Sequence, residues 1–189
     1  NMDVSIECNT NDEVKTLTES IQQMAQNLKA YVKEINGLVY RDGLTGVKNK
    51  MYYSEYIKSL SEEEQKQPYA IVVFKVTGLA GVNKTRGRKC GDELIVTACG
   101  IICRVFSHSP IFRIGGDEFV AFLKGNDYMK CGELLREFED LSSDVTLVSA
   151  PDIAVRIVYG TAQSADGTES YEEVFCRADE EMDQKKKGM

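Results

Sequence analysis

The sequence is poor in the features that mark several common classes of protein. Its 189 residues include a single histidine, His108, so no histidine-based metal cluster is possible. No segment approaches the roughly 20 apolar residues that span a bilayer, and there is no signal-peptide pattern. A net charge of −7 argues against a nucleic-acid duplex or an anionic membrane surface as the main partner. An acidic domain can still bind a nucleotide through a metal ion and a few local cations.

The cysteines are scattered and contain no CxxC pair, which favours reduced, mostly buried thiols over a disulfide framework or a zinc site. Two of them lie four residues apart in an apolar helical stretch and are expected to share a helix face. The six positions are Cys8, Cys90, Cys99, Cys103, Cys131 and Cys176.

The first forty residues carry a narrow apolar seam. Its members recur at alternating spacings of three and four, which is an a/d heptad pattern. A monomeric helix alone cannot bury such a seam. The pattern therefore predicts a parallel, dimeric coiled coil, and the alternative is a single helix packed on its own domain. The seam consists of Val14, Leu17, Ile21, Met24, Leu28, Tyr31, Ile35 and Leu38.

The remaining residues, 40–189, predict one α+β domain with an antiparallel-rich sheet and helices on one face. Helices are expected over 50–60, 92–107, 127–141 and 170–187, with a short one within 78–87. Strands are expected over 69–76, 111–114, 119–123, 145–148 and 153–159. Gly115-Gly116 predicts a tight hairpin, since both glycines can take positive φ.

Two adjacent acids, Asp117 and Glu118, follow the Gly-Gly turn. Neighbouring carboxylates repel each other unless a cation lies between or beside them. Glycines also allow the backbone to approach a ligand closely, as phosphate sites require. The spacing alone leaves two interpretations open, a metal–phosphate site and a solvated turn.

The stretch Gly115–Phe119 is the signature of the GGDEF family, and other motifs of that family follow the same order here. Arg41–Lys50 (RDGLTGVKNK) resembles the family's opening DxLTGLxNR. The resemblance covers about residues 40–189. The matching positions are Asp42, Leu44, Thr45, Gly46, Asn49, Asn83, Gly91-Asp92-Glu93-Leu94, Arg113, Arg177-Ala178-Asp179 and Lys186.

The resemblance implies a polymerase-palm-like, nucleotidyl-cyclase-like sheet flanked by helices. It also implies the activity of a diguanylate cyclase, in which two GTP molecules condense to cyclic di-GMP and release two pyrophosphates. Each subunit of a homodimer then brings one GTP. Such chemistry is mostly positioning and metal-assisted stabilisation of charge, with Mg²⁺ as the expected cofactor.

Carried over by position, Asn83 and Asp92 would bind the guanine edge. Gly115, Gly116 and Lys186 would lie against the phosphates. Taken by itself, Asn83 is typical of an ordinary turn, and Lys186 is typical of a frayed cationic C-terminus. Only their places in the ordered pattern favour the functional interpretation.

The metal ligands implied by the family are Asp117, Glu118 and the backbone carbonyl of Val76. Asp117 and Glu118 would also be the catalytic acids. The family strand normally supplies a further aspartate, and the position that aligns with it is Lys75. An ammonium group cannot ligate magnesium, which requires oxygen ligands.

The departure at Lys75 changes the local electrostatics. A charge pair at about 4 Å is worth roughly 4 kcal/mol at intermediate dielectric, so repulsion in place of attraction disfavours a bound cation. Lys75 could instead pair with Asp117 or Glu118 and hold the hairpin in shape. The strand's second aspartate is replaced by Thr77, and the family's phenylalanine–lysine pair by Leu79-Ala80.

The family's product-inhibition motif RxxD is also missing. Its place is taken by Phe106-Ser107-His108-Ser109, so product inhibition at that site is expected to be absent.

Asp3–Leu28 is similar to the end of a HAMP domain, a module that passes helix motion from a membrane to an output domain. The chain does not begin with methionine. We therefore expect residues 1–39 to be a HAMP-like signalling helix and residues 40–189 a cytoplasmic GGDEF domain, both cut from a membrane-anchored receptor.

Three functions remain open from the sequence. The first is a guanine-nucleotide-binding domain with weak or absent cyclase activity. The second is an active diguanylate cyclase, and the third is a dimerisation module that binds no nucleotide.

Overall fold

The computed structural model describes residues 12–60, 67–165 and 169–188. The chain divides into two compact units, Asn1–Arg41 and Asp42–Met189. None of the helices in the described part of the chain is long and apolar enough to cross a membrane.

In the first unit, the described residues include a 28-residue helix, α1 (Asp12–Val39). The seam residues whose side chains are described, from Val14 to Tyr31, are between 41% and 71% exposed. The side chains of Ile35 and Leu38, at the end of the expected seam, lie outside the described set. The helix itself is as the heptad pattern predicts.

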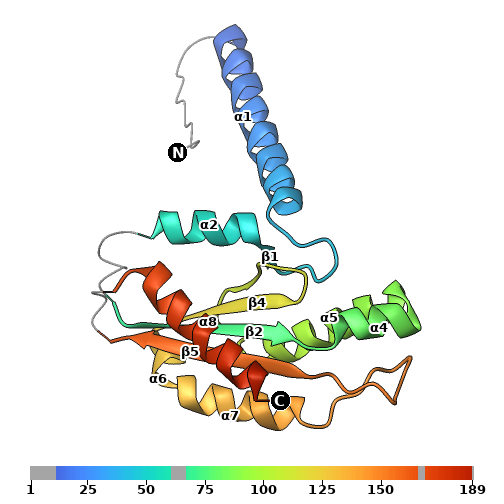
Figure 1. Cartoon of the computed structure of the whole chain (residues 1–189). Helices are drawn as coiled ribbons and strands as arrows, with labels where there is room; N and C mark the ends of the chain where they lie inside the picture. Colours follow the sequence, from blue (N-terminus) through green and yellow to red (C-terminus); the bar gives the residue numbers. More distant parts are fainter. Residues whose placement is uncertain (1–11, 61–66, 166–168, 189) are drawn as a thin grey trace. The chain divides into compact units, whose positions relative to one another are not determined.

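The second unit is built on a five-stranded mixed sheet in the order β1-β3-β4-β2-β5 (Figure 1). All neighbouring strands are antiparallel except β1 and β3. This confirms the antiparallel-rich sheet. The strands are β1 (Lys48–Asn49), β2 (Tyr69–Val76), β3 (Ile111–Arg113), β4 (Glu118–Lys124) and β5 (Ile157–Ser164).

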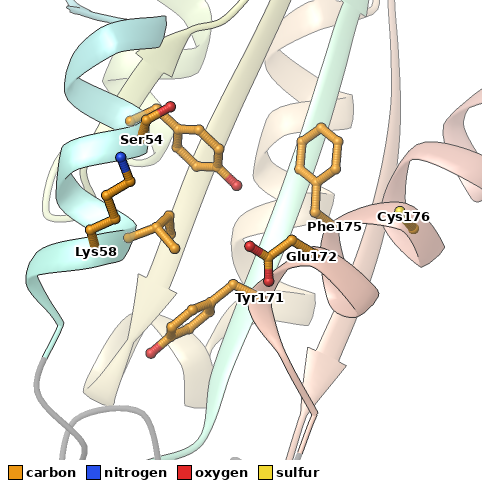
Figure 2. Close-up of a pocket in the computed structure, with 8 residues that line it drawn as sticks. Ser54, Lys58, Tyr171, Glu172, Phe175 and Cys176 are labelled. Atoms are coloured by element: carbon orange, nitrogen blue, oxygen red, sulfur yellow. The ribbon is translucent and has the colours of Figure 1, made fainter.

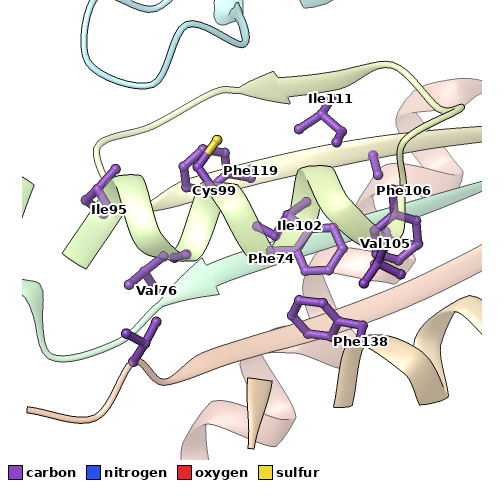
Figure 3. Packing of buried hydrophobic residues seen from close by; sticks show 14 of the residues in the cluster. Phe74, Val76, Ile95, Cys99, Ile102, Val105, Phe106, Ile111, Phe119 and Phe138 are labelled. Carbon is purple, nitrogen blue, oxygen red and sulfur yellow. The ribbon is translucent and has the colours of Figure 1, made fainter. Parts of the chain in front are cut away.

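Helices cover both faces of the sheet, so the expectation of helices on one face was wrong. On one face, α5 and α7 pack on the cluster that contains Val72 and Phe74 (Figure 3). On the other, α2 and α8 pack on the cluster that contains Ile71 and Val73. The reason lies in β2, whose first six residues are all apolar and buried, so that both faces need a cover. The helices are α2 (Lys50–Ser59), α4 (Leu79–Arg86), α5 (Arg88–Val105), α6 (Gly125–Met129), α7 (Cys131–Ser142) and α8 (Tyr171–Lys187).

Two other expected elements differ from the structure. The single helix expected over 127–141 is two helices, α6 and α7, because the backbone leaves the helical conformation at Lys130 (φ −95°, ψ 11°). The strand pair around Ala150-Pro151 reduces to one bridge between Thr146 and Ala154. Beyond that bridge the Arg156 carbonyl accepts the Thr77 N–H at 2.9 Å, and the chain then pairs with β2 as β5.

At Gly160 of β5 the sheet packs directly against the backbone of α8. A Cβ at this position would lie 2.1 Å from the Ala178 carbonyl oxygen and 2.4 Å from the Met182 nitrogen, both backbone atoms. We expect Gly160→Ala to lower the free energy of unfolding by about 1–3 kcal/mol, measured by urea denaturation. Gly100→Ala is the matched control, because that helical glycine has nothing within 4 Å and should gain up to about 1 kcal/mol. Equal stability of the two variants would contradict this packing.

Candidate functional site

The register between β2 and β4 places Lys75 directly opposite Glu118. Side chains alternate between the faces of a strand, so Lys75 shares a face with Ile71 and Val73, on the side covered by α8. Glu118 shares that face with Val120. The strand pairing therefore forces the lysine and the acid of the signature hairpin to meet.

Lys75 and Glu118 form an ion pair, with Nζ 2.5 Å from Oε1. The hydrogen bond to Glu118 raises the pKa of Lys75, although burial opposes it, and the charges of Glu118, Asp117 and Asp183 raise it further. The pKa of Asp179 is also raised, by burial and then by the charges of Asp183 and Glu118. The ammonium therefore lies among carboxylates of the hairpin and of α8. The sequence named Glu118 as one of two candidate partners. It named Asp179 only as part of a matching motif and gave no signal for Asp183.

The hairpin needs glycine because a side chain would be crowded there, and not because the backbone is left-handed. The hairpin predicted at these glycines is confirmed by the antiparallel pairing of β3 and β4, but positive φ occurs at other glycines and not at Gly115 or Gly116. A Cβ at Gly115 would instead lie 2.8 Å from Oε2 of Glu118. The turn is also tied to β2, because the Val76 N–H donates to the Asp117 carbonyl at 2.8 Å.

Arg113 joins the hairpin to the loop that precedes α2. Its guanidinium donates to Asp42 Oδ1 at 2.7 Å and to the Gly116 carbonyl at 2.5 Å. The same Asp42 oxygen accepts from the Thr45 N–H at 2.9 Å and from the Thr45 hydroxyl at 2.7 Å. Burial raises the pKa of Asp42, but the hydrogen bonds from Thr45 and Arg113 outweigh it and lower the pKa overall. Both motifs were visible in the sequence, while this link between them was not.

The corner between α4 and α5 brings together the two residues expected at the guanine edge. Asn83 is half-buried on α4, and its Oδ1 lies so close to Gly91 that a Cβ there would stand 2.0 Å away. Asp92 follows on α5 and is exposed. Lys186 lies exposed in the last turn of α8.

The residues present do not fit a magnesium ion. Lys75 takes Oε1, one of the two carboxylate oxygens of Glu118, at 2.5 Å, and adds a like charge. In the part of the chain that the structure describes, no three His, Cys, Asp or Glu side chains are placed to hold a metal. Val76 lies at the end of β2, next to the hairpin.

A separate pocket of about 290 Å³ lies between α2 and α8 (Figure 2). It contains none of the expected site residues, and its lining is largely apolar. It is lined by Tyr53, Ser54, Ile57, Lys58, Tyr171, Glu172, Phe175 and Cys176.

Solved structures support the fold. The coiled coil and GGDEF domain of DgcB from Caulobacter crescentus, in complex with c-di-GMP, superposes with a TM-score of 0.77 at 22% identity, over 94% of this chain and 96% of that one. Diguanylate cyclase SiaD from Pseudomonas aeruginosa, in complex with its activator SiaC, gives a TM-score of 0.69 at 24% identity over 94% of this chain and 68% of that one.

Curated sequences agree. Diguanylate cyclase DgcS of Shewanella oneidensis is 31% identical over 148 residues, which cover 77% of this chain. Probable diguanylate cyclase DgcT of Escherichia coli is 28% identical over 75% of this chain. The matched parts cover 49% and 32% of these two relatives. The family model for "Diguanylate cyclase, GGDEF domain" matches residues 39–189, and the chain therefore belongs to the GGDEF family of diguanylate cyclase domains.

Proposed function

We propose that this chain is a guanine-nucleotide-binding signalling domain whose cyclase activity is weak or lost. The observation that carries the proposal is the 2.5 Å contact between Lys75 Nζ and Glu118 Oε1. A diguanylate cyclase needs divalent cations to offset the charge of the reacting phosphates. Here a tethered ammonium occupies part of the space that such a cation would need.

A metal ion would have to displace Lys75 from Oε1 of Glu118 or share that carboxylate with it. The two side chains are only 20% and 33% exposed, so solvent screens their attraction incompletely. If both cations stayed, the repulsion between a divalent ion and the ammonium at about 4 Å would cost roughly 8 kcal/mol at intermediate dielectric. Either route weakens the charge stabilisation on which condensation of two GTP molecules depends.

Nucleotide binding draws on a different part of the site. The Asn83 amide can donate to and accept from a purine edge, and the Asp92 carboxylate can accept from the guanine N1–H and N2–H groups. Gly115 and Gly116 would face the phosphates, with Lys186 as the nearby cation. None of these groups takes part in the ion pair between Lys75 and Glu118.

An active cyclase is the second candidate, favoured by one observation. The Asp117 carboxylate makes no side-chain hydrogen bond with the residues described, so one acid of the signature stays available to a cation. The 31% identity to diguanylate cyclase DgcS points the same way. This alternative predicts that Asp117→Ala abolishes turnover.

The proposed context is a homodimer joined through α1. Its exposed apolar seam is what a parallel coiled coil would bury. Residues 1–39 would then be a HAMP-like input helix and residues 40–189 the output domain, on the cytoplasmic side of a membrane-anchored parent. Most of the HAMP-like stretch before α1 lies outside the described residues.

Turnover of GTP to cyclic di-GMP tests the role of Lys75. With equal magnesium, we expect near-background product from the natural chain and at least a roughly tenfold gain in Lys75→Asp, because an acid replaces the competing ammonium. Lys89→Asp controls for the change in net charge, and Lys75→Asp combined with Asp117→Ala should return to background. Vigorous turnover by the natural chain would refute the proposal and establish the active cyclase.

Calorimetric titration with GTP tests the guanine site separately from catalysis. We expect Asp92→Ala to weaken binding by about tenfold or more, since a hydrogen bond to a charged group contributes about 1.5–3 kcal/mol. Asn83→Ala should weaken it by about fivefold. Glu137→Ala, an exposed acid on α7, is the control. If the natural chain takes up no GTP, the domain is a dimerisation module instead.

Sedimentation equilibrium tests the coiled coil. Leu17→Asp with Leu28→Asp should raise the dimer dissociation constant by at least about 100-fold, because charges replace seam residues that are 61% and 54% exposed in the isolated chain. Ser20→Asp with Gln26→Asp adds the same charge outside the seam and should leave the dimer intact. Equal effects of the two double variants would rule out dimerisation through this face.

A further inference from the structure

Two cysteines with no role in the proposed nucleotide chemistry lie side by side on α5. The sulfur atoms of Cys99 and Cys103, one helical turn apart, are 3.8 Å from each other. Cys99 is 4% exposed and belongs to the core under β3 and β4 (Figure 3). Cys103 is half-buried, so the pair is open to solvent on one side only. The five described cysteines are all free.

The spacing suits one bridging atom better than a direct disulfide. Residues four apart on a helix have Cβ atoms about 5–6 Å apart. A disulfide needs Cβ atoms about 3.5–4.5 Å apart, so oxidation would require α5 to unwind. By contrast, two sulfurs bound tetrahedrally to one metal at about 2.3 Å stand about 3.8 Å apart. The two thiols already have that separation within an intact helix.

We propose that Cys99 and Cys103 form a dithiol site that binds a single thiophilic metal or metalloid centre through both sulfurs. Soft thiolate ligands select such centres over magnesium or calcium. Among the described residues no third His, Cys, Asp or Glu completes the site, so water or a small exogenous ligand fills the other positions. Each thiol gives up its proton as its sulfur–metal bond forms, and no electrons are transferred.

The dithiol is connected to the signature hairpin. Cys103 and burial raise the pKa of the Cys99 thiol, while the nearby Thr45 and Arg113 side chains lower it. These two side chains share Asp42 Oδ1, and Arg113 also binds the Gly116 carbonyl. A centre bound at Cys99 would therefore lie near the groups that hold the hairpin against the 42–47 loop. The inference is independent of whether GTP is bound or turned over.

Phenylarsine oxide is the probe, because its arsenic binds two thiols and its oxygen leaves as water with their two protons. Added in one equivalent to the reduced full chain, it should give one adduct by intact mass and remove two thiols from alkylation. Cys99→Ser and Cys103→Ala should each weaken capture by at least about 100-fold, because the chelate is lost. Cys90→Ser, a buried cysteine on the same helix, is the matched control and should bind as the natural chain does.

Variants are compared only if they melt at the same temperature as the natural chain. Of the two variants within the pair, Cys103→Ala is the one expected to do so, because its position is half-buried. Undiminished capture by folded Cys103→Ala, or loss of capture in Cys8→Ser, would overturn the site. Hydrogen exchange tests the connection to the hairpin. The arsenical should change exchange over 113–119 at least about threefold in the natural chain and not in Cys103→Ala. Unchanged exchange over that segment in the natural chain would overturn the connection.

Discussion

The antiparallel register of β2 against β4 is the constraint on which the rest of the site depends. It sets Lys75 opposite Glu118, and a slip of one residue would turn every side chain of β2 to the other face. Such a slip is prevented because β2 is buried on both faces by two different apolar clusters. The ammonium at position 75 is therefore held in the acidic corner by the packing of the whole domain, and not by its own ion pair alone.

The rest of the site follows from that placement. Without Lys75, the acids of the hairpin would face the α8 carboxylates Asp179 and Asp183 without its ammonium to offset their charge. Arg113 carries out a similar task on the other side of the turn, where it joins Asp42 to the Gly116 carbonyl. Two protein cations thus stabilise the signature turn. The shape of the turn is therefore supported by groups of the protein itself.

The sequence predicted what local patterns determine and missed what tertiary contacts determine. The apolar run of β2, the Gly-Gly hairpin and the helix that begins after Ser170 were all visible, the last because Ser170 and Glu173 form a capping box. The two-residue strand β1 leaves no pattern to detect. The break at Lys130 and the approach of α8 over Gly160 depend on neighbours distant in sequence. In the site, the order of the motifs identified Asn83 and Asp92 as candidate residues. No pattern indicated that α8 places acids beside Lys75.

The charge balance of the corner also limits how a nucleotide could be recognised. Lys75 faces the carboxylates of Asp117, Glu118, Asp179 and Asp183, so these five side chains taken together remain net acidic. Triphosphate oxygens placed there would meet more negative than positive charge, and a mobile cation is disfavoured by the lysine already present. On the proposed function, therefore, affinity has to come mainly from the base, at the corner of α4 and α5, where Gly91 leaves room for the Asn83 amide. A domain of this kind would report the presence of guanine nucleotide without depending on the chemistry of its phosphates.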